Sequence, residues 1–364
     1  MTAPPSAAAY TTPPIPAARR WPGWLLWPYR LACLALGGWL LICLLLALFQ
    51  RRLIYHPAQV PALAPPSDLP WASAKALQVT TEDGQTLNGW RLSPKSPVAR
   101  AHRRNPQQAP SDPTDAASLS AVPQSAAAPP APASTSITST EADADSSSPQ
   151  PPPVVLYFCG NAGHRGYRLA DFEVLIAAGA EVCCFDYRGY GDNLGTPTEA
   201  DLRRDARSAW NLLTGPLQIP ARRIVLFGES LGGGVATRLA ADVCADQQIP
   251  GGLVLRSTFN SLREIAAAQF SWVPVGLLLV DRYESQQCVG GVTCPVLSLH
   301  GERDTIVPLK SGRMLFNSAP PQSHNGVAKQ FVPLPRADHN DVIETETPRV
   351  LESLRRFFAV VTTL

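Results

Sequence analysis

A serine between two glycines is the pattern in this chain that points most directly to chemistry. Gly228, Ser230 and Gly232 have the spacing G-x-S-x-G, and they directly follow the apolar run at residues 223–227. Glycines at these positions let the backbone turn sharply, so that the serine hydroxyl is presented between a strand and a helix. A serine presented in this way can attack an acyl carbonyl, so the pattern predicts nucleophilic acyl transfer. A glycine-rich turn around an ordinary serine is the structural alternative.

A serine hydroxyl needs a base to become a good nucleophile. Three histidines follow Ser230 in the chain: His300, His324 and His339. His339 stands in LPRADHND, after the apolar run QFVPLP and before a helical stretch, which places it in a loop beyond the last strand. His300 ends the strand VLSLH, where we expect it to be held in the structure. His324 lies in the polar loop PPQSHNG, where we expect it to be solvated.

The base in turn needs an acid that orients it. Asp304 follows the strand VLSLH, so its carboxylate can reach an imidazole on a neighbouring loop. Asp338 and Asp341 are close to His339 in sequence, and we expect them to be solvated charges that cap the next helix. Asp281 is a further candidate upstream.

Stabilising the oxyanion of an acyl-transfer intermediate takes two backbone N–H groups. The residue after the nucleophile, Leu231, supplies one candidate. The glycine-rich loop at residues 159–163, which follows the apolar run VVLYF, supplies the other through Asn161. A plain turn between a strand and a helix is the alternative reading of this loop.

Several segments together resemble one family. The segments are LYFCGNAG, CFDYRGYGDNLGTPTE, FGESLGGGVA, RSTFNSL, VLSLHGERDTIVP and ADHND, in this order. Over residues 76–360, apart from an insert near 95–152, the chain resembles the membrane-anchored α/β-hydrolase-domain proteins of the bud-emergence type. It is also similar to serine aminopeptidase-like hydrolases and to the protein depalmitoylase group.

The resemblance implies a role for each candidate residue. Ser230 would be the nucleophile, Asp304 the acid and His339 the base, while Asn161 and Leu231 would supply the oxyanion donors. Apart from the resemblance, this chemistry needs no cofactor, and we expect a small or lipid-like acyl substrate.

The chain departs from the pattern of the family at two positions. Cys159 stands where the family usually has the histidine of H-G-N-A-G, which puts the shape and hydrogen bonding of the oxyanion loop in question. Asn193 replaces a serine, and we expect little effect from that change. Asp186 and Arg188 in DYRGYG would fix the loop beside the site.

Apolar runs alternate with helical stretches after residue 153, which predicts an α/β-hydrolase fold: a mostly parallel sheet with helices on both faces. The domain is expected over residues 76–364, and the pair Asp83-Gly84 indicates a hairpin at its start. A short cap is expected at residues 259–293. Its apolar side chains could form an acyl-binding wall or could simply pack on the core; they are Phe270, Trp272, Leu277, Leu278 and Leu279.

Residues 31–49 contain no charge and would extend about 28 Å as a helix, close to the thickness of the hydrocarbon core of a bilayer. We therefore expect a transmembrane signal anchor at residues 31–50, after a tail at 1–30 and before a linker at 51–75. A cleaved signal peptide is the runner-up, but the segment that follows, QRRLIYHP, offers no small-residue cleavage site. Arginines slightly favour a cytoplasmic N-terminus, so we expect a bacterial inner-membrane protein with a periplasmic hydrolase domain.

The remaining features exclude some classes of function. The net charge is +2 and no basic stripe is present, so nucleic acid is not an expected partner. The insert at residues 96–153 is rich in Ala, Pro, Ser and Thr, and we expect it to be disordered. None of the eight cysteines has metal-ligand spacing, although Cys288 and Cys294 could pair in an oxidising compartment.

Two classes of function stay open at this point. The first is a membrane-tethered serine hydrolase that cleaves acyl esters or thioesters through an acyl-enzyme intermediate, with amides not excluded. The second is a non-catalytic, hydrolase-like binding or scaffold protein at the membrane. Ser230, Asp304 and His339 in the expected order favour the first, and the Cys159 departure is the only support for the second.

Overall fold

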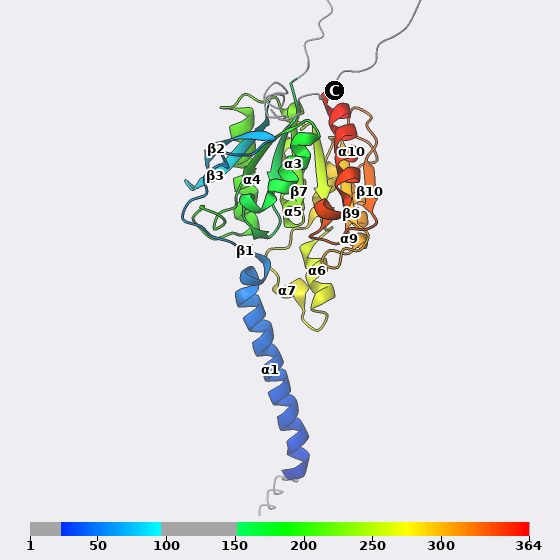
Figure 1. The fold of residues 1–364 in the computed structure, drawn as a ribbon. Coiled ribbons are helices and arrows are strands. Elements are labelled where there is room, and N and C mark those ends of the chain that lie inside the picture. Colours follow the sequence, from blue (N-terminus) through cyan, green and yellow to red (C-terminus); the bar gives the residue numbers. More distant parts are fainter. Residues whose placement is uncertain (1–22, 96–150, 364) are drawn as a thin grey trace, which may run out of the picture.

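An eight-stranded sheet forms the centre of the molecule, whose computed structural model describes residues 23–95 and 151–363 (Figure 1). The strand order is β10-β9-β8-β7-β4-β6-β3-β2. The strands are β2 (Ala72–Thr80), β3 (Thr86–Pro94), β4 (Val154–Phe158), β6 (Glu181–Phe185), β7 (Ile224–Glu229), β8 (Gly252–Arg256), β9 (Val296–Gly301) and β10 (Gln330–Leu334). Residues 96–150 of the predicted insert lie outside the described residues.

The strands from β10 to β6 run parallel, and only the hairpin of β2 and β3 is antiparallel to its neighbours. Every residue of β4, β8 and β9 is buried. Parallel strands are covered on both faces, which explains why these segments read as continuous apolar runs and not as alternating patterns. The predicted α/β-hydrolase fold is confirmed.

The two faces of the sheet carry different helices. On one face α3 packs against α10, and on the other α4 packs against α5. The helices of the two faces are α3 (Leu169–Ala177), α4 (Glu199–Thr214), α5 (Leu231–Ala245), α9 (Leu309–Ser318) and α10 (Val342–Thr362). Short 3₁₀ turns precede α3 and β7; they are η1 (Arg165–Arg168) and η2 (Ala221–Arg223).

The hairpin forms the edge of the sheet beside β6. Thr80 pairs with Thr86, and Gly84 in the turn has a φ of 80°, which a glycine adopts without strain. Farther along, Leu92 of β3 and Val155 of β4 are both partners of Val182, one on each side of β6. The two ends of the chain that flank the insert therefore lie close to each other.

Helix α1 (Gly23–Ile54) projects from the domain as a single long rod (Figure 1). Among the described residues it is the one helix long and apolar enough to cross a membrane, over Leu26–Ile54. Residues 51–75, expected to form a linker, begin inside this helix. They continue into a short strand, β1 (His56–Pro57), which pairs with β5 (Ala162–Gly163).

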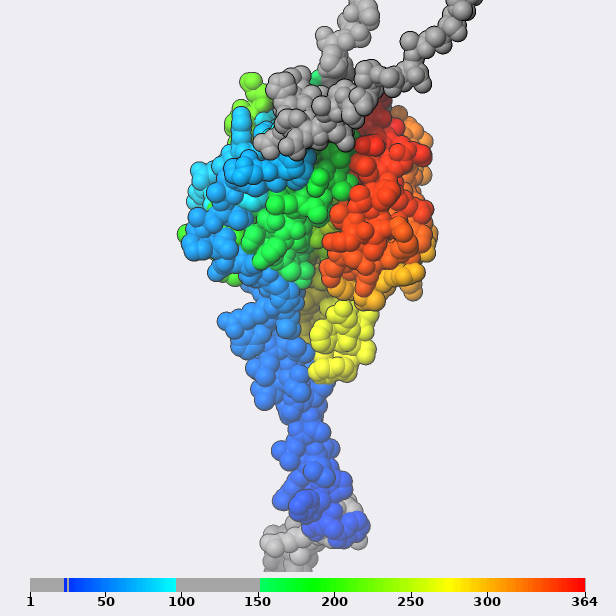
Figure 2. All heavy atoms as spheres, viewed as in Figure 1, coloured from blue at the N-terminus to red at the C-terminus, as the bar shows by residue number. Residues whose placement is uncertain are grey.

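The segment between β8 and β9 holds only short helices. They are α6 (Leu262–Gln269), α7 (Val275–Leu278), α8 (Ser285–Cys288) and η3 (Val289–Gly291). In the space-filling view, α6 and α7 lie beside the upper part of α1, below the main body of the domain (Figure 2). All eight cysteines are free thiols, so Cys288 and Cys294 are not paired in this structure.

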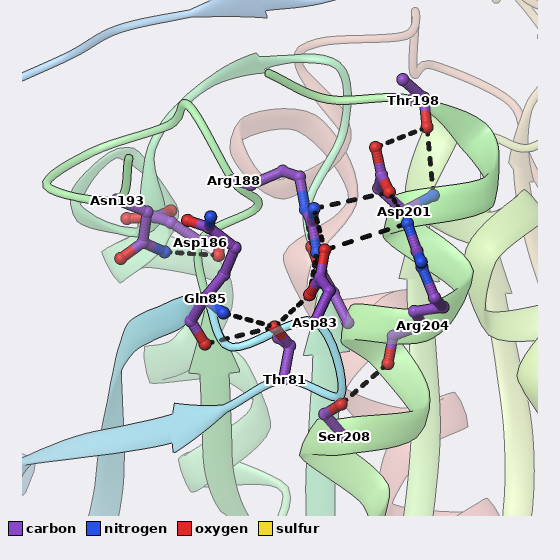
Figure 3. A network of polar contacts seen from close by, with 11 residues as sticks. Thr81, Asp83, Gln85, Asp186, Arg188, Asn193, Thr198, Asp201, Arg204 and Ser208 are labelled. Carbon is purple, nitrogen blue, oxygen red and sulfur yellow. Dashed lines mark hydrogen bonds and ion pairs between the residues drawn. The ribbon is translucent and has the colours of Figure 1, made fainter. Parts of the chain in front are cut away.

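An arginine after β6 joins three parts of the chain (Figure 3). Arg188 Nε lies 2.9 Å from Asp205 Oδ2 on α4, and its Nη1 lies 2.8 Å from Asp83 Oδ2 in the hairpin turn. The Nη1 atom also lies 3.4 Å from Asp201 Oδ1. Burial raises the pKa of Asp205, whereas hydrogen bonds from Arg188 lower the pKa of Asp83. The network fixes the loop of Arg188 to both the hairpin and α4.

We predict that Arg188→Ala lowers the free energy of unfolding by about 3 kcal/mol, because the buried carboxylate of Asp205 is then left without a cation, whereas Asp83 and Asp201 still have Arg204. Arg203→Ala is the matched control, since Arg203 is half-exposed and pairs with Asp242 at the surface; we expect a change below about 1 kcal/mol. Urea unfolding in mild detergent measures both. Equal effects of the two substitutions would contradict a structural role for the Arg188 network.

Candidate active site

Ser230 occupies a strained turn between β7 and α5. Its φ is 50° and its ψ is −114°, a combination that non-glycine residues rarely adopt and that tends to occur at functional sites. A Cβ atom on Gly228 would lie 2.5 Å from the carbonyl oxygen of Gly232. A Cβ atom on Gly232 would collide with the carbonyl oxygen of Phe158. Both glycines of the predicted pattern are therefore required for the turn.

Ser230, His339 and Asp304 lie in one line of contacts. His339 Nε2 is 3.0 Å from Ser230 Oγ, and His339 Nδ1 is 2.8 Å from Asp304 Oδ2. The Asp304 side chain is fully buried, and its Oδ1 accepts the backbone N–H groups of Ile306 and Val307. In this arrangement His339 donates from Nδ1 to Asp304, and Nε2 is free to accept the serine proton.

The loop that carries His339 is tied to the loop that carries Asp304. Asp338 Oδ1 accepts the N–H of Thr305 at 2.8 Å and the N–H of His339 at 2.7 Å. Asp341 Oδ1 accepts the N–H of Asp338 at 2.7 Å. Asp341 is the N-cap residue of α10, but its side chain makes no capping bond. The expectation that these two aspartates cap the helix was wrong: their carboxylates serve the two site loops.

Of the other candidate histidines and acids, His300 lies beside Asp304, with its Nε2 3.5 Å from Asp304 Oδ2 and 2.9 Å from the Val307 carbonyl. His300 is buried, and burial lowers its pKa. His324 is exposed, with its ring 3.1 Å from the carbonyl of Thr293. Asp281 binds residues of α1 and its surroundings, outside the line of contacts. The structure thus brings Ser230, His339 and Asp304 into one line of contacts, with His300 beside Asp304, while His324 and Asp281 lie outside that line.

The two predicted oxyanion donors flank the serine. Leu231 is the first residue of α5, where a backbone N–H has no acceptor within its own helix, and both Leu231 and Asn161 line the same pocket as Ser230. The Asn161 carbonyl accepts from Tyr190 at 2.8 Å, and its side-chain amide donates to the Ile54 carbonyl at 3.0 Å. These bonds fix the loop against the end of α1.

Cys159 does not loosen this loop. Its side chain is buried, with Sγ 3.6 Å from Cys184 Sγ, and its carbonyl accepts the hydroxyl of Tyr187 at 2.8 Å. Two tyrosines, Tyr187 and Tyr190, therefore hold successive parts of the loop in the absence of the imidazole that the family usually has there.

A largely buried cluster of charges adjoins the serine. Glu229 is within 2.5 Å of Arg168 and 3.3 Å of Arg256, and it accepts the hydroxyl of Tyr157 at 2.9 Å. Arg256 also pairs with Asp171. Burial alone would raise the pKa of Glu229, but the charges of Arg256 and Arg168 outweigh it and lower the pKa to about 2. Sequence patterns did not reveal this cluster, because its members come from four separate elements.

A largely apolar pocket lies over Ser230. Of the cap residues proposed as an acyl wall, Phe270, Leu278 and Leu279 line the pocket, whereas Trp272 and Leu277 are exposed and do not. The end of α1 forms another part of the lining, through residues 46–54, and this contribution was missed. The apolar residues 46–49 indicate only a membrane span, and no sequence pattern reports their second role in the pocket. Among the described residues, no group of His, Cys, Asp or Glu is placed to hold a metal.

We predict that Glu229→Gln flattens the acid dependence of stability. A carboxyl whose pKa is about 2 when folded and near 4.5 when unfolded adds stability above pH 4.5, and this is lost as the pH falls toward 2. The loss amounts to about 3 kcal/mol for such a shift. Unfolding measured from pH 6 to pH 2 should therefore fall more steeply for the wild type than for the variant, and parallel curves would contradict the assignment.

Comparisons with known proteins follow the same lines. A model of the family described as serine aminopeptidase, S33, matches residues 149–280. An uncharacterized protein of Mycobacterium tuberculosis is 33% identical over 309 residues, covering 85% of this chain and 86% of that protein. Lysophosphatidylserine lipase ABHD12 of Danio rerio is 36% identical over 197 residues, or 50% of this chain and 51% of that protein. The chain thus spans only about half the length of the lipase.

Solved structures show the same fold at low identity. The Pyrococcus furiosus esterase Pf2001 has a TM-score of 0.52 and 18% identity, covering 83% of this chain and 98% of the esterase. The alignment with the mycobacterial relative covers most of both chains, and the family model matches the segment that contains the turn at Ser230. The sheet has the expected topology. The chain therefore belongs to the α/β-hydrolase family, in its serine aminopeptidase-like group of serine hydrolases.

Proposed function

We propose that the protein is a membrane-anchored serine hydrolase that cleaves acyl esters or thioesters, with Ser230, His339 and Asp304 as its catalytic triad. The observation that carries the proposal is the unbroken line of contacts from Asp304 through His339 to Ser230, at 2.8 and 3.0 Å. Its position at the floor of an apolar pocket supports an acyl substrate.

The chemistry follows from this geometry. Ser230 Oγ attacks the acyl carbonyl while His339 Nε2 takes the hydroxyl proton, and Asp304 holds the imidazole and stabilises its positive charge. The N–H groups of Leu231 and Asn161 stabilise the oxyanion of the tetrahedral intermediate. His339 then protonates the leaving alcohol or thiol. Water, activated by the same histidine, releases the acyl group from Ser230 and restores the enzyme.

Esters and thioesters are the favoured substrates because the pocket offers apolar contact and few polar groups. The lipase and esterase relatives carry names that point to ester substrates, which supports the same choice for this chain. The reaction requires no cofactor, since serine, histidine, aspartate and water balance every proton transfer.

Helix α1 is the proposed anchor. Its leucines between positions 31 and 48 are mostly half-exposed or more, which would leave a long apolar surface in water. Inside a bilayer the same surface is favourable, and the helix satisfies its own backbone. Because residues 46–54 also line the pocket, removal of the helix as a signal peptide would open the site. This supports a retained anchor over a cleaved one.

The proposed location is a bacterial inner membrane with the domain on the periplasmic side. Arg19, Arg20 and Arg30 precede the span in sequence. Two arginines, Arg51 and Arg52, follow the span. This asymmetry favours a cytoplasmic N-terminus.

We predict that a fluorophosphonate labels the detergent-solubilised wild type and fails to label Ser230→Ala. Ser257→Ala is the matched control: Ser257 is also buried, has a φ of 48°, and follows a strand, so it should keep its labelling. If all three folded proteins remain unlabelled, the hydrolase proposal fails and a non-catalytic membrane protein becomes the better account. Hydrolysis rates of an ester, a thioester and an anilide with the same acyl group then show which leaving group the enzyme prefers.

We also predict that Asp304→Asn lowers kcat by about 10⁴-fold, because the amide no longer holds the required tautomer of His339. Asp338→Asn is the control, since Asp338 precedes His339 and binds only backbone N–H groups and a threonine hydroxyl; a loss below about tenfold is expected. Steady-state hydrolysis of a soluble short-chain ester measures both. Equal losses would argue against Asp304 as the orienting acid.

A further inference from the structure

The pocket over Ser230 is bounded by two segments that are far apart in sequence. One wall is the end of α1, and the opposite wall is built by α6, α7 and the residues that join them. Of the twenty described residues that line it, four are polar and none is charged. The polar ones are Gln50, Asn161, Ser230 and Gln269. The cavity has a volume of about 210 Å³.

Side chains of α1 hold the opposite wall in place. Gln50 Nε2 donates to the Leu278 carbonyl at 3.1 Å, and Gln50 Oε1 accepts the N–H of Val280 at 2.7 Å. Trp39 Nε1 donates to the carbonyl of Trp272 at 3.1 Å. A loop exposed to hydrocarbon must have its backbone groups satisfied by protein, and these bonds satisfy three of them.

The segment 270–280, with the sequence FSWVPVGLLLV, carries no charge. Val273, Val275 and Leu279 pack with Cys43 of α1 in a small cluster separate from the core of the domain. The other face of the segment is left open, and Leu277 is 84% exposed there. An apolar side chain exposed beside a membrane-spanning helix is at the right place to contact lipid.

The polar boundary falls at the same height on both walls. On α1 the apolar surface ends at Arg51, and on the facing segment it ends at Asp281; the two side chains pair at 3.1 Å. Tyr55 donates to the same carboxylate. Trp39 lies about 18 Å from Arg51 along the helix axis, a length comparable to one leaflet of a hydrocarbon core of about 30 Å. The segment 270–280 thus runs along α1 within the depth of one leaflet.

We propose that the groove between α1 and the segment 270–280 opens into one leaflet of the membrane and admits the hydrocarbon chain of an ester amphiphile laterally, so that its carbonyl reaches Ser230 without the lipid leaving the bilayer. This inference rests on the proposed function for the chemistry at Ser230, but lipid can bind in the groove by the lateral route without being hydrolysed. Since no residue that lines the pocket is charged, the pocket binds the hydrocarbon chain and the ester group of the amphiphile. The headgroup of the amphiphile stays at the level of Arg51.

Photocrosslinking tests the route without turnover. Full-length Ser230→Ala is reconstituted in phosphatidylcholine vesicles that contain a monoacylglycerol with a diazirine in the middle of its chain, then irradiated and mapped by mass spectrometry. Adducts on both walls, at residues 46–54 of α1 and at 273–279, are expected. Adducts confined to the outer face of α1, with none on the pocket side of either wall, would overturn the proposal.

Activity tests the membrane contact of the outer wall. Leu277→Glu should lower the ratio of hydrolysis of the vesicle-bound monoacylglycerol to that of a soluble butyrate ester by about tenfold, since Leu277 lies outside the pocket. Leu194→Glu is the matched control, because Leu194 is 81% exposed on a loop of the main domain. The ratio should stay unchanged there. Equal ratios for the two variants would overturn the insertion of the segment.

The two proposals fail in different ways. If the wild type is not labelled by a fluorophosphonate but adducts form on both walls, the hydrolase proposal fails and the lateral groove stands. If the wild type is labelled, adducts are absent from both walls and Leu277→Glu behaves like Leu194→Glu, the hydrolase proposal stands and the lateral route is wrong.

Discussion

The close approach of backbone at the end of β7 is the constraint on which the site depends. Gly228 and Gly232 leave no room for a Cβ atom, because the turn presses against α5 on one side and against the end of β4 on the other. This close packing keeps Ser230 at a positive φ, and helix α5 begins at the next residue. Since the neighbouring parallel strands end at the same edge, the loops after β9 and β10 bring Asp304 and His339 into one line of contacts with the Ser230 hydroxyl.

The charged layer behind the serine has the opposite character to the pocket in front of it. Behind Ser230, Glu229 and two arginines form a largely buried ionic cluster; in front of it, the lining is mostly apolar and carries no charge. Such an arrangement keeps formal charge out of the space where an acyl chain would lie. It also fixes the turn at Ser230 through several ion pairs instead of one. These ion pairs oppose the relaxation of the strained backbone.

Most of the fold and the three residues of the candidate site were predictable from short stretches of sequence, because each of these features is local. The G-x-S-x-G pattern directly follows an apolar strand, and Asp304 and His339 each lie within a few residues of a strand end. The errors concern contacts between distant segments. Asp338 has a residue type typical of a helix cap, yet its carboxylate binds the N–H of Thr305, 33 residues away. The contribution of α1 to the pocket was missed because Gln50 and Leu278 are 228 residues apart, and no periodicity reports such a pairing.

The position of the long insert has a consequence for how the family can vary. Leu92 and Val155 lie on either side of Val182, so the chain leaves the sheet and re-enters it about two strand spacings apart, or roughly 10 Å. Three or four extended residues could bridge that gap. Closing a flexible loop becomes only about 0.6 kcal/mol less favourable for each doubling of its length. The junction lies at the edge of the sheet opposite the serine, so related chains are free to lengthen or shorten there while the geometry of the site is preserved.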